Sequence, residues 1–455
     1  MAGNRNQSLL AGPVGLLLAR PWLDRAALLG LKHVYFPLSR LWAAARAAHG
    51  DRDAFFAAIP LPRRLEHSER LASALAKFEE ARAAVNGIEA EWERVFFGPE
   101  DQPESYRVAV ETARLNRRHA YNATRRHFAF LLPQHIPRVK LEVDTPEAVR
   151  AVYGPALADR RHYVAVPNPM PVVEASRTVL GANGREYWVR FASPSARLAD
   201  TVYARVYEPD GIKDPPTLIL GHGVCVEFDH WHGLIDETQA LVAAGIRVIR
   251  PEAPWHGRRV SPGNFGGERI IGQVPTGALD GFLGAMREWA VLADYAKSTS
   301  GGPLLIGGTS LGALFAQLAA DCAHDWPDAI KPQAMLLITH TGHMSDAMLG
   351  GALTDLVGQA SQIEAAGWTP AAVTPYLRLI DPERPPVMAA SRIVSVQGSR
   401  DAVTPFPGGE ALVKRWALPA ANMFVSDQGH FTVPMGLKRN RAPVERFIEI
   451  ARALK

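Results

Sequence analysis

The sequence lacks the features that mark several large classes of protein. None of its 455 residues belongs to an uninterrupted apolar run of the roughly 18 residues that a membrane-spanning helix needs. Two cysteines, Cys225 and Cys322, are too few for a disulfide framework. The 38 glycines and 35 prolines follow no fixed period, which excludes collagen-like and low-complexity chains. What is left is a globular chain, 47% hydrophobic and 21% charged, that is long enough to bury a large core.

A strong net charge is also missing. The chain has 50 Lys and Arg against 46 Asp and Glu, a formal charge of +4, which is too mild to indicate nucleic-acid binding. One local feature is sharper, because four arginines lie within about 20° of a common direction on a helical wheel: Arg107, Arg114, Arg118 and Arg125. We expect a solvated helix face paired with neighbours such as Glu111. The alternative is a surface for an acidic partner or a lipid headgroup.

The N-terminus contains a short apolar stretch. Arg5 precedes apolar residues 9–19, a length typical of the core of a signal peptide, but Arg20-Pro21-Trp22 follows instead of a cleavage site. We therefore expect a cytoplasmic protein in which this stretch is packed or lies on a surface. A cleaved signal peptide is the alternative.

The chain divides into a helical N-terminal part and a longer C-terminal part. Residues 1–135 are predicted to be a helical extension, with apolar residues at three-to-four spacing over 67–97 and 103–132. Residues 150–455 are predicted to be the second domain. It begins with short β-like runs, at 161–166, 172–180, 186–192 and 201–208. Asn183-Gly184 between two of them indicates a hairpin.

After Pro215-Pro216, strands and helices alternate. Strands are expected at 217–221, 246–250, 304–307, 334–339, 392–396 and 422–425, and helices at 233–244, 277–297, 311–323, 409–416 and 444–454. Uniformly apolar strands separated by helices indicate a mostly parallel, doubly wound sheet that is covered on both faces. The earlier β-like runs would add antiparallel strands at one edge, and residues 345–380 are expected to form a helical insertion. The predicted fold class is α/β.

The strongest chemical signal is Gly308-Thr309-Ser310-Leu311-Gly312, between a predicted strand and a predicted helix. In that context a G-x-S-x-G motif indicates a nucleophile elbow, a tight turn that lifts the serine hydroxyl clear of the sheet. The alternative is a glycine-rich turn in a domain without catalysis.

A serine needs a base to take its proton and an acid to orient that base. Asp401 follows the predicted strand 392–396, and His430 follows the last one, in the chain order Ser, Asp, His. We therefore predict the catalytic triad Ser310, Asp401 and His430. Two N–H groups should bind the oxyanion, those of Leu311 and of Val224, which lies in the loop after strand 217–221.

The C-terminal two thirds resemble an α/β-hydrolase of the serine esterase and lipase superfamily. The resemblance rests on His222-Gly223, the elbow at Ser310, Asp401, His430, and Pro254-Trp255-His256-Gly257-Arg258. It implies the α/β-hydrolase fold and cleavage of a carboxylic ester or related acyl bond through an acyl-enzyme, without a cofactor. Residues 1–135 have no counterpart in the minimal fold of this superfamily.

Other residues near the predicted site have less specific roles. We expect His222, Cys225, Trp255, His256 and His340 to contact substrate or to shape loops. The Gly-rich loop 260–277 is expected to be a flexible rim of the pocket. The insertion is expected either to pack as core or to cover an acyl pocket as a lid.

A metal site is an alternative that two clusters raise. They are His340, His343 and Asp346 after one predicted strand, and Glu227, Asp229, His230 and His232 after another. Neither has a spacing that fixes ligands on one face of an element, so we expect no metal.

The sequence thus predicts a serine hydrolase acting on a small acyl substrate, apolar or aromatic because of the 10 Trp, 17 Phe and the insertion. A thioesterase, C–C hydrolase or acyltransferase would use the same triad, and a non-catalytic binding protein would use only the fold. The extension, residues 1–135, is expected to cap the pocket, to form a homodimer or to contact a membrane surface.

Overall fold

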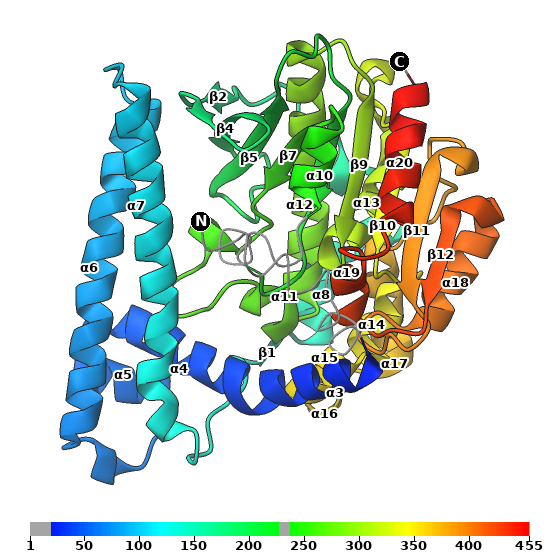
Figure 1. Ribbon diagram of the computed structural model, residues 1–455. Helices are drawn as coiled ribbons and strands as arrows, with labels where there is room; N and C mark the ends of the chain where they lie inside the picture. The colour runs from blue at the N-terminus through cyan, green and yellow to red at the C-terminus, as the bar shows by residue number, and fades with distance from the viewer. Residues whose placement is uncertain (1–19, 227–236, 455) are drawn as a thin grey trace.

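A ten-stranded sheet forms the centre of the protein, whose computed structural model describes residues 20–226 and 237–454 (Figure 1). The strand order is β12-β11-β10-β9-β6-β7-β5-β4-β2, with β3 also paired to β4. Neighbours from β12 to β7 are parallel, whereas the pairs that involve β5, β4, β3 and β2 are antiparallel. The predicted parallel sheet with an antiparallel edge is therefore confirmed. The strands, in chain order, are β2 Glu174–Ala175, β3 Val179–Leu180, β4 Gly184–Ala192, β5 Thr201–Pro209, β6 Thr217–Gly221, β7 Arg247–Pro251, β9 Leu304–Thr309, β10 Ala334–Ile338, β11 Ile393–Gly398 and β12 Met423–Ser426.

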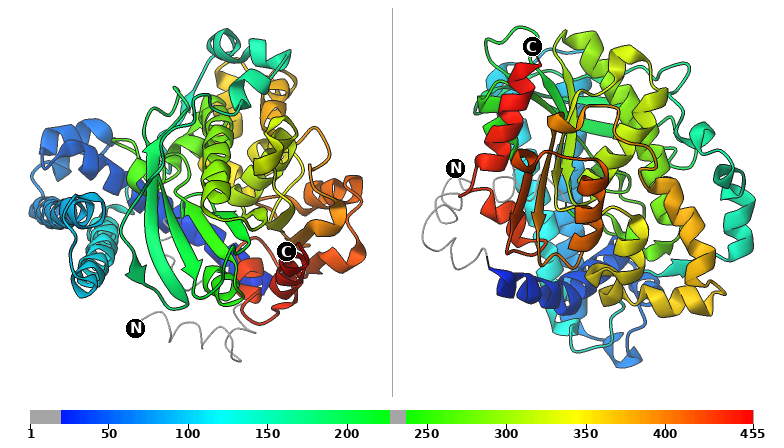
Figure 2. Two further views of the ribbon diagram at one scale, coloured as in Figure 1. Left: turned by 90° about the horizontal axis from the view of Figure 1, so that it is seen from above. Right: turned by 90° about the vertical axis from the view of Figure 1, so that its right-hand side faces the viewer.

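Helices cover both faces of this sheet (Figure 2). Alternate residues of a strand point to opposite faces, so Ile306 of β9 packs in one apolar cluster and Leu305 in another. The long helices α12 (Thr276–Thr299) and α13 (Leu311–Cys322) pack in the first cluster. The second cluster contains α10 (Thr238–Ala243) and α20 (Ala442–Ala453). Burial on both faces explains why the parallel strands are uniformly apolar.

Several shorter elements complete this part of the chain. A small parallel sheet pairs β1 with β8, and a run of helices, α14 to α17, forms the insertion before β11. The remaining elements are β1 Glu142–Val143, α8 Pro146–Tyr153, η4 Pro155–Leu157, α9 Arg161–Val164, η5 Gly257–Arg259, α11 Glu268–Gly272, β8 Gln273–Val274, η6 Ala323–Asp325, η7 Asp328–Ile330, α14 Met344–Gly350, α15 Ala352–Val357, α16 Gln359–Ala365, α17 Pro370–Leu377, η8 Arg378–Ile380, η9 Ala390–Arg392, α18 Phe406–Arg415, η10 Ala420–Asn422 and α19 Thr432–Gly436. Among the residues described, no helix combines the length and the apolar character that crossing a bilayer would require.

Residues 21–131 form helices that pack against the sheet-containing part. They are α3 Pro21–Gly30, the π-helical turn η1 Leu31–Tyr35, α4 Phe36–Ala48, α5 Arg52–Ala58, η2 Arg63–Leu65, α6 Glu69–Phe97, α7 Glu104–Ala123 and the 3₁₀ segment η3 Thr124–Leu131. Helices α6 and α7 form a hairpin at one side of the molecule (Figures 1 and 2). Phe36, Leu41 and Trp42 of α4 belong to the same apolar cluster as α12 and α13. The helical extension therefore shares a core with the rest, and the predicted domain boundaries stay a prediction.

One predicted strand is wrong and a second is interrupted, because tertiary contacts override local preference. Residues 161–166 contain the helix α9, which follows Arg160, a side chain that binds Asp321 over 2.5 Å. Residues 172–180 are broken into β2 and β3 at Arg177, whose guanidinium binds the carbonyl of Gly98 and the carboxylate of Asp101 in the α6–α7 loop. The predicted helix 233–244 is described only from residue 237, and it includes α10.

The row of arginines, which lies on α7 and η3, was predicted to be solvated and that is wrong, whereas its predicted pairing with Glu111 is confirmed. Arg114 is fully buried, pairs with Glu111 over 2.8 Å, and lies over the rings of Trp92 and Trp188. The apolar surface of these two indoles covers the guanidinium while its charge is matched by the carboxylate. The helical wheel identified the face that the arginines share, but it did not identify the indoles of Trp92 and Trp188 that bury Arg114.

Candidate active site

Ser310 lies in the turn between β9 and α13. Its φ of 57° and ψ of −118° are a strained combination for a residue with a side chain. A Cβ on Gly308 would lie 2.3 Å from the carbonyl carbon of Gly312, and a Cβ on Gly312 would lie 2.2 Å from that of Gly221. Glycine at these positions lets β9, α13 and β6 meet, and the turn has the form of the predicted nucleophile elbow.

Asp401 and His430 reach Ser310 from loops that follow β11 and β12. The Ser310 hydroxyl lies 2.9 Å from Nε2 of His430, and Nδ1 of His430 lies 2.8 Å from Oδ2 of Asp401. All three side chains are buried. The structure thus brings together the three residues that chain order selected, at hydrogen-bond distances suited to a nucleophile, a base and an orienting acid.

Thr404 is a member of this site that the sequence reasoning missed. Its hydroxyl donates to Oδ2 of Asp401 over 2.9 Å and lies 3.2 Å from Nδ1 of His430. The other oxygen of Asp401 accepts the N–H groups of Val403 and Thr404, both over 2.9 Å. An aspartate followed by a threonine three residues later is a local turn signal that could have indicated this contact.

The loop after β6 passes close to the serine. A Cβ on Gly223 would lie 3.7 Å from Cβ of Ser310, and Val224 lines the same cavity as Ser310 and Leu311. Leu311 is the first residue of α13, where an N–H has no partner inside the helix. Both residues that were predicted to bind an oxyanion therefore border the nucleophile, at the positive end of a helix dipole.

His222 and His256 hold this loop in place. His222 donates from Nδ1 to the carbonyl of Gly223 over 2.8 Å and accepts the N–H of Ala253 at Nε2 over 3.1 Å. His256 accepts the N–H of Cys225 at Nε2 over 3.0 Å, and the two rings lie 4.9 Å apart. Burial lowers the pKa of His222 well below its usual range, so this imidazole stays neutral. The two histidines thus tie the loop after β6 to the loop after β7.

The other three residues singled out near the site lie outside the triad. Trp255 is buried, with the guanidinium of Arg269 4.3 Å from its ring centre. His340 is buried behind the triad, where burial lowers its pKa to about 4. Burial raises the pKa of the Cys225 thiol, which disfavours the thiolate. These side chains shape the site, and none of the three lines the cavity at Ser310.

The cavity at Ser310 is small and apolar. It measures about 70 Å³. The insertion contributes Met344, Ala347, Met348, Leu353 and Thr354, and α11, α12 and α13 contribute most of the rest. The insertion also buries its apolar face, so it packs as core and covers the cavity at once. Loop 260–277, predicted as a flexible rim, is largely buried and contains α11 and β8.

The N-terminal helices border the same site. The hydroxyl of Tyr35 donates to the carbonyl of Cys225 over 3.0 Å. Arg40 of α4 binds both carboxylate oxygens of Glu268 in α11, over 2.9 and 2.8 Å. Burial raises the pKa of Glu268, while Arg40 opposes that rise. Sequence reasoning had assigned none of these contacts, because they join segments about 190 and 228 residues apart.

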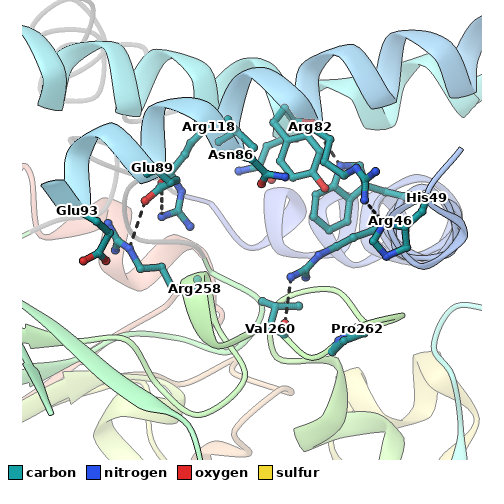
Figure 3. A pocket seen from close by; sticks show the side chains of 16 residues that line it. Arg46, His49, Arg82, Asn86, Glu89, Glu93, Arg118, Arg258, Val260 and Pro262 are labelled. Carbon is teal, nitrogen blue, oxygen red and sulfur yellow. Dashed lines mark hydrogen bonds and ion pairs between the residues drawn. The ribbon is translucent and has the colours of Figure 1, made fainter. Parts of the chain in front are cut away.

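A larger cavity of about 510 Å³ lies elsewhere, between α4, the α6–α7 hairpin and the loop after β7 (Figure 3). Its walls contain both acidic and basic side chains, and these form ion pairs with other residues of the protein. Arg118 binds Glu89 over 3.2 Å, and Arg258 binds Glu252 over 2.8 Å. It shares no lining residue with the cavity at Ser310. Size alone therefore does not identify the reactive site.

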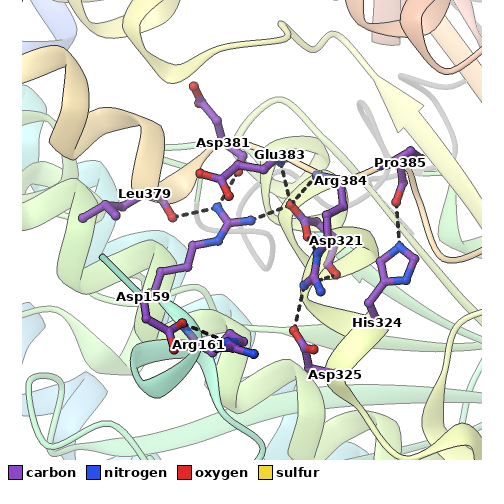
Figure 4. Close-up of polar contacts among 11 residues, drawn as sticks. Asp159, Arg161, Asp321, His324, Asp325, Leu379, Asp381, Glu383, Arg384 and Pro385 are labelled. Carbon is purple, nitrogen blue, oxygen red and sulfur yellow. Dashed lines mark hydrogen bonds and ion pairs between the residues drawn. The ribbon is translucent and has the colours of Figure 1, made fainter. Parts of the chain in front are cut away.

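A polar cluster fixes the far end of α13 (Figure 4). Asp321 accepts hydrogen bonds from the guanidinium groups of Arg160 and Arg384 over 2.5 and 2.6 Å. Arg160 also donates to the carbonyls of Leu379 and Asp381 at the end of the insertion. Helix α13, which follows Ser310 directly, is thus held at its C-terminal end as well.

Metal ligands do not gather in the described part of the chain, where no group of three or more His, Cys, Asp or Glu side chains could hold an ion. His343 hydrogen-bonds Asp381 over 3.1 Å, and His340 hydrogen-bonds Gln317 and Ser395. The second cluster considered above, Glu227, Asp229, His230 and His232, lies outside the described residues.

Comparison with known proteins gives similarities of structure. No protein-family model matches the sequence, and no curated protein sequence matches it. Acetyl xylan esterase 1 from Thermoanaerobacterium sp. JW/SL YS485 is 17% identical, with a TM-score of 0.45, over 69% of this chain and 96% of its own. The acetyl xylan esterase from Paenibacillus sp. R4 is 17% identical, with a TM-score of 0.44, over 70% of this chain and 98% of its own. An acylaminoacyl peptidase from Pyrococcus horikoshii is 11% identical, with a TM-score of 0.41, over 62% of this chain and 48% of its own.

The fold itself follows from the topology. A mostly parallel sheet with an antiparallel edge carries a strained Ser turn after β9, an Asp after β11 and a His after β12. That strand-by-strand placement is the arrangement of one fold family. The chain has the α/β-hydrolase fold.

Proposed function

We propose that the protein is a serine hydrolase that cleaves a carboxylic ester or a related acyl bond. The observation that carries the proposal is the hydrogen-bonded row of Ser310, His430 and Asp401, with 2.9 and 2.8 Å between successive partners. A non-catalytic binding protein would have no use for a strained serine turn joined to a buried histidine and carboxylate.

In the proposed first half-reaction, Oγ of Ser310 attacks the acyl carbon while Nε2 of His430 takes the hydroxyl proton. The carbonyl π electrons move onto oxygen, and the N–H groups of Val224 and Leu311 stabilise the resulting oxyanion. Asp401 keeps Nδ1 protonated and stabilises the imidazolium. The tetrahedral intermediate collapses to an acyl-enzyme, and His430 gives its proton to the departing oxygen.

In the second half-reaction, water attacks the acyl-enzyme while His430 again acts as the base. The new tetrahedral intermediate releases the carboxylic acid, and the proton returns to Oγ of Ser310. The apolar walls of the 70 Å³ cavity favour an apolar acyl group. The contacts of α3 and α4 with the site support a capping role for the N-terminal helices rather than a role in dimer formation or membrane contact.

The test is hydrolysis of p-nitrophenyl esters of increasing chain length, together with labelling by a fluorophosphonate probe. We expect turnover and labelling in the wild type, and a loss of roughly 10⁴-fold or more in kcat for Ser310→Ala. Ser361→Ala is the matched control, because Ser361 is an exposed serine on α16. It should leave both readouts unchanged.

Each other outcome has a definite meaning. Labelling at Ser310 without turnover of any ester would favour a thioesterase, C–C hydrolase or acyltransferase that uses the same triad. A folded wild-type protein that the probe does not label would contradict the proposal and favour a binding protein.

A further inference from the structure

We propose that Asp24, on helix α3 of the N-terminal extension, is a positioning residue for His430. This inference rests on the proposed function, because positioning matters only if His430 is the base. Asp24 does not touch the reacting atoms, and it acts through the backbone on either side of the histidine.

The carboxylate of Asp24 accepts four hydrogen bonds from the residues that flank His430. Oδ1 accepts the N–H of Phe431 over 2.8 Å and that of Thr432 over 3.2 Å. Oδ2 accepts the N–H of Gly429 over 3.2 Å and the hydroxyl of Thr432 over 2.5 Å. All four partner groups donate, and an ionised carboxylate is the common side chain that only accepts hydrogen bonds.

This contact is buried and closely fitted. Asp24 is only 8% exposed, although it lies on a helix whose other residues are partly or fully exposed. A Cβ on Gly429 would lie 2.4 Å from the carboxyl carbon of Asp24, so the carboxylate can approach the backbone only because residue 429 is glycine. Hydrogen bonds to a buried charged acceptor are stronger than those between neutral groups.

Two carboxylates therefore hold His430 in complementary ways. Asp401 binds the ring at Nδ1, and Asp24 fixes the backbone from which that ring projects. The Ser310 hydroxyl must stay within hydrogen-bond reach of Nε2 for proton transfer. Displacement of a catalytic group by about 1 Å can cost roughly 100-fold in rate.

The same segment reaches two further parts of the site. Tyr35 holds the carbonyl of Cys225, next to Val224, and Arg40 holds Glu268 beside the cavity wall. Residues 21–48 thus contact the histidine loop, the predicted oxyanion loop and the pocket wall within one continuous stretch. Asp24 is the member with the most direct connection to the triad.

The test compares Asp24→Asn with wild type. The amide keeps the size of the side chain but replaces one acceptor oxygen by an NH₂ group that faces donors. We expect the second-order rate constant for fluorophosphonate labelling of Ser310, and kcat for the best p-nitrophenyl ester, to fall 10- to 100-fold. KM should change less than twofold, because Asp24 does not line the cavity.

Asp51→Asn is the matched control. Asp51 also accepts a backbone N–H in the N-terminal region, from Ala54 over 2.9 Å, but it caps α5 and has no contact with the histidine loop. This variant should label at the wild-type rate. A purely structural role of Asp24 predicts instead that a folded Asp24→Asn variant labels at the wild-type rate, and that result would overturn the inference.

A second variant keeps the inference testable if Asp24→Asn does not fold. Gly429→Ala pushes a methyl group against the Asp24 carboxylate, whose three atoms are the ones nearest to that methyl group. It should slow labelling by 10-fold or more, and labelling at the wild-type rate would again contradict the inference. If the wild type itself is not labelled, the proposed function fails, and that outcome is distinct from failure at Asp24.

Discussion

Replacement of Arg40 by methionine should destabilise the protein in a manner that depends on pH. Arg40 is almost fully buried and donates to both oxygens of Glu268 and to the carbonyl of Gly263, all over 2.8–2.9 Å. Glu268 is completely buried and also accepts the N–H groups of Lys140 and Phe265. Methionine fills much of the space of the arginine but leaves the carboxylate without its counter-charge.

Removal of one partner of a buried ion pair costs about 3–5 kcal/mol. Burial raises the pKa of Glu268, and Arg40 partly offsets that rise. The pKa of Glu268 is therefore higher still in the variant, which lacks Arg40. A carboxyl group with a raised folded-state pKa binds its proton more tightly in the folded than in the unfolded protein. The destabilisation should therefore be smallest near pH 4.5 and largest near pH 8, after the pH has passed the raised pKa.

The assay is urea unfolding of wild type and Arg40→Met at pH 5 and pH 8, followed by tryptophan fluorescence. The double variant Arg40→Met with Glu268→Gln removes both charges, and it should be more stable at pH 8 than Arg40→Met alone. Arg161→Met is the control, because Arg161 pairs with Asp159 on the surface and should contribute little. An equal loss of stability at both pH values in Arg40→Met would refute the electrostatic argument.

Three further predictions concern the elbow, the cavity and a buried histidine. Gly312→Ala should abolish fluorophosphonate labelling, because its Cβ would lie 2.2 Å from the backbone of Gly221 and must displace the turn that carries Ser310. Normal labelling of this variant would contradict the described elbow. Met348→Phe should shift the p-nitrophenyl ester profile toward shorter chains, since Met348 lines a cavity of only about 70 Å³; an unchanged profile would place the acyl group elsewhere. Between pH 7 and pH 4.5, the free energy of unfolding should fall by about 2 kcal/mol more in the wild type than in His340→Gln. The reason is that a buried histidine with a pKa of about 4 destabilises the fold as the pH falls from 6.5 toward 4. Urea midpoints measured at both pH values check that difference, and parallel losses would contradict it.

The sequence predicted the elements whose signals are local. The elbow at Ser310 was identifiable because the glycines, the preceding strand and the following helix lie within about 20 residues. Asp401 and His430 were identifiable because the fold fixes which strands precede them. In both cases a short motif and a chain order carry the information, and no distant contact is needed.

The parts that escaped prediction depend on contacts between distant segments. Arg160 directs its neighbourhood into a helix through Asp321, 161 residues away, and no local pattern at residues 161–166 encodes that partner. Asp24 looks like an ordinary residue in the first turn of a helix, where aspartate is common. Its four partners lie more than 400 residues along the chain. Thr404 is the exception, because its contact with Asp401 is local and could have been found.

The hydrogen bonds between α3 and the histidine loop have a consequence for biosynthesis. Asp24 emerges from the ribosome 405 residues before Gly429, at a synthesis rate of about 5–20 residues per second. For all that time, the buried side of α3 has no partner from the C-terminal loop. Contacts of such long sequence separation form slowly, because the intervening chain must first be ordered. Helix α3 therefore reaches its final position only after almost the whole protein has been synthesised, and nascent chains stopped before residue 429 should lack a formed nucleophile–base pair.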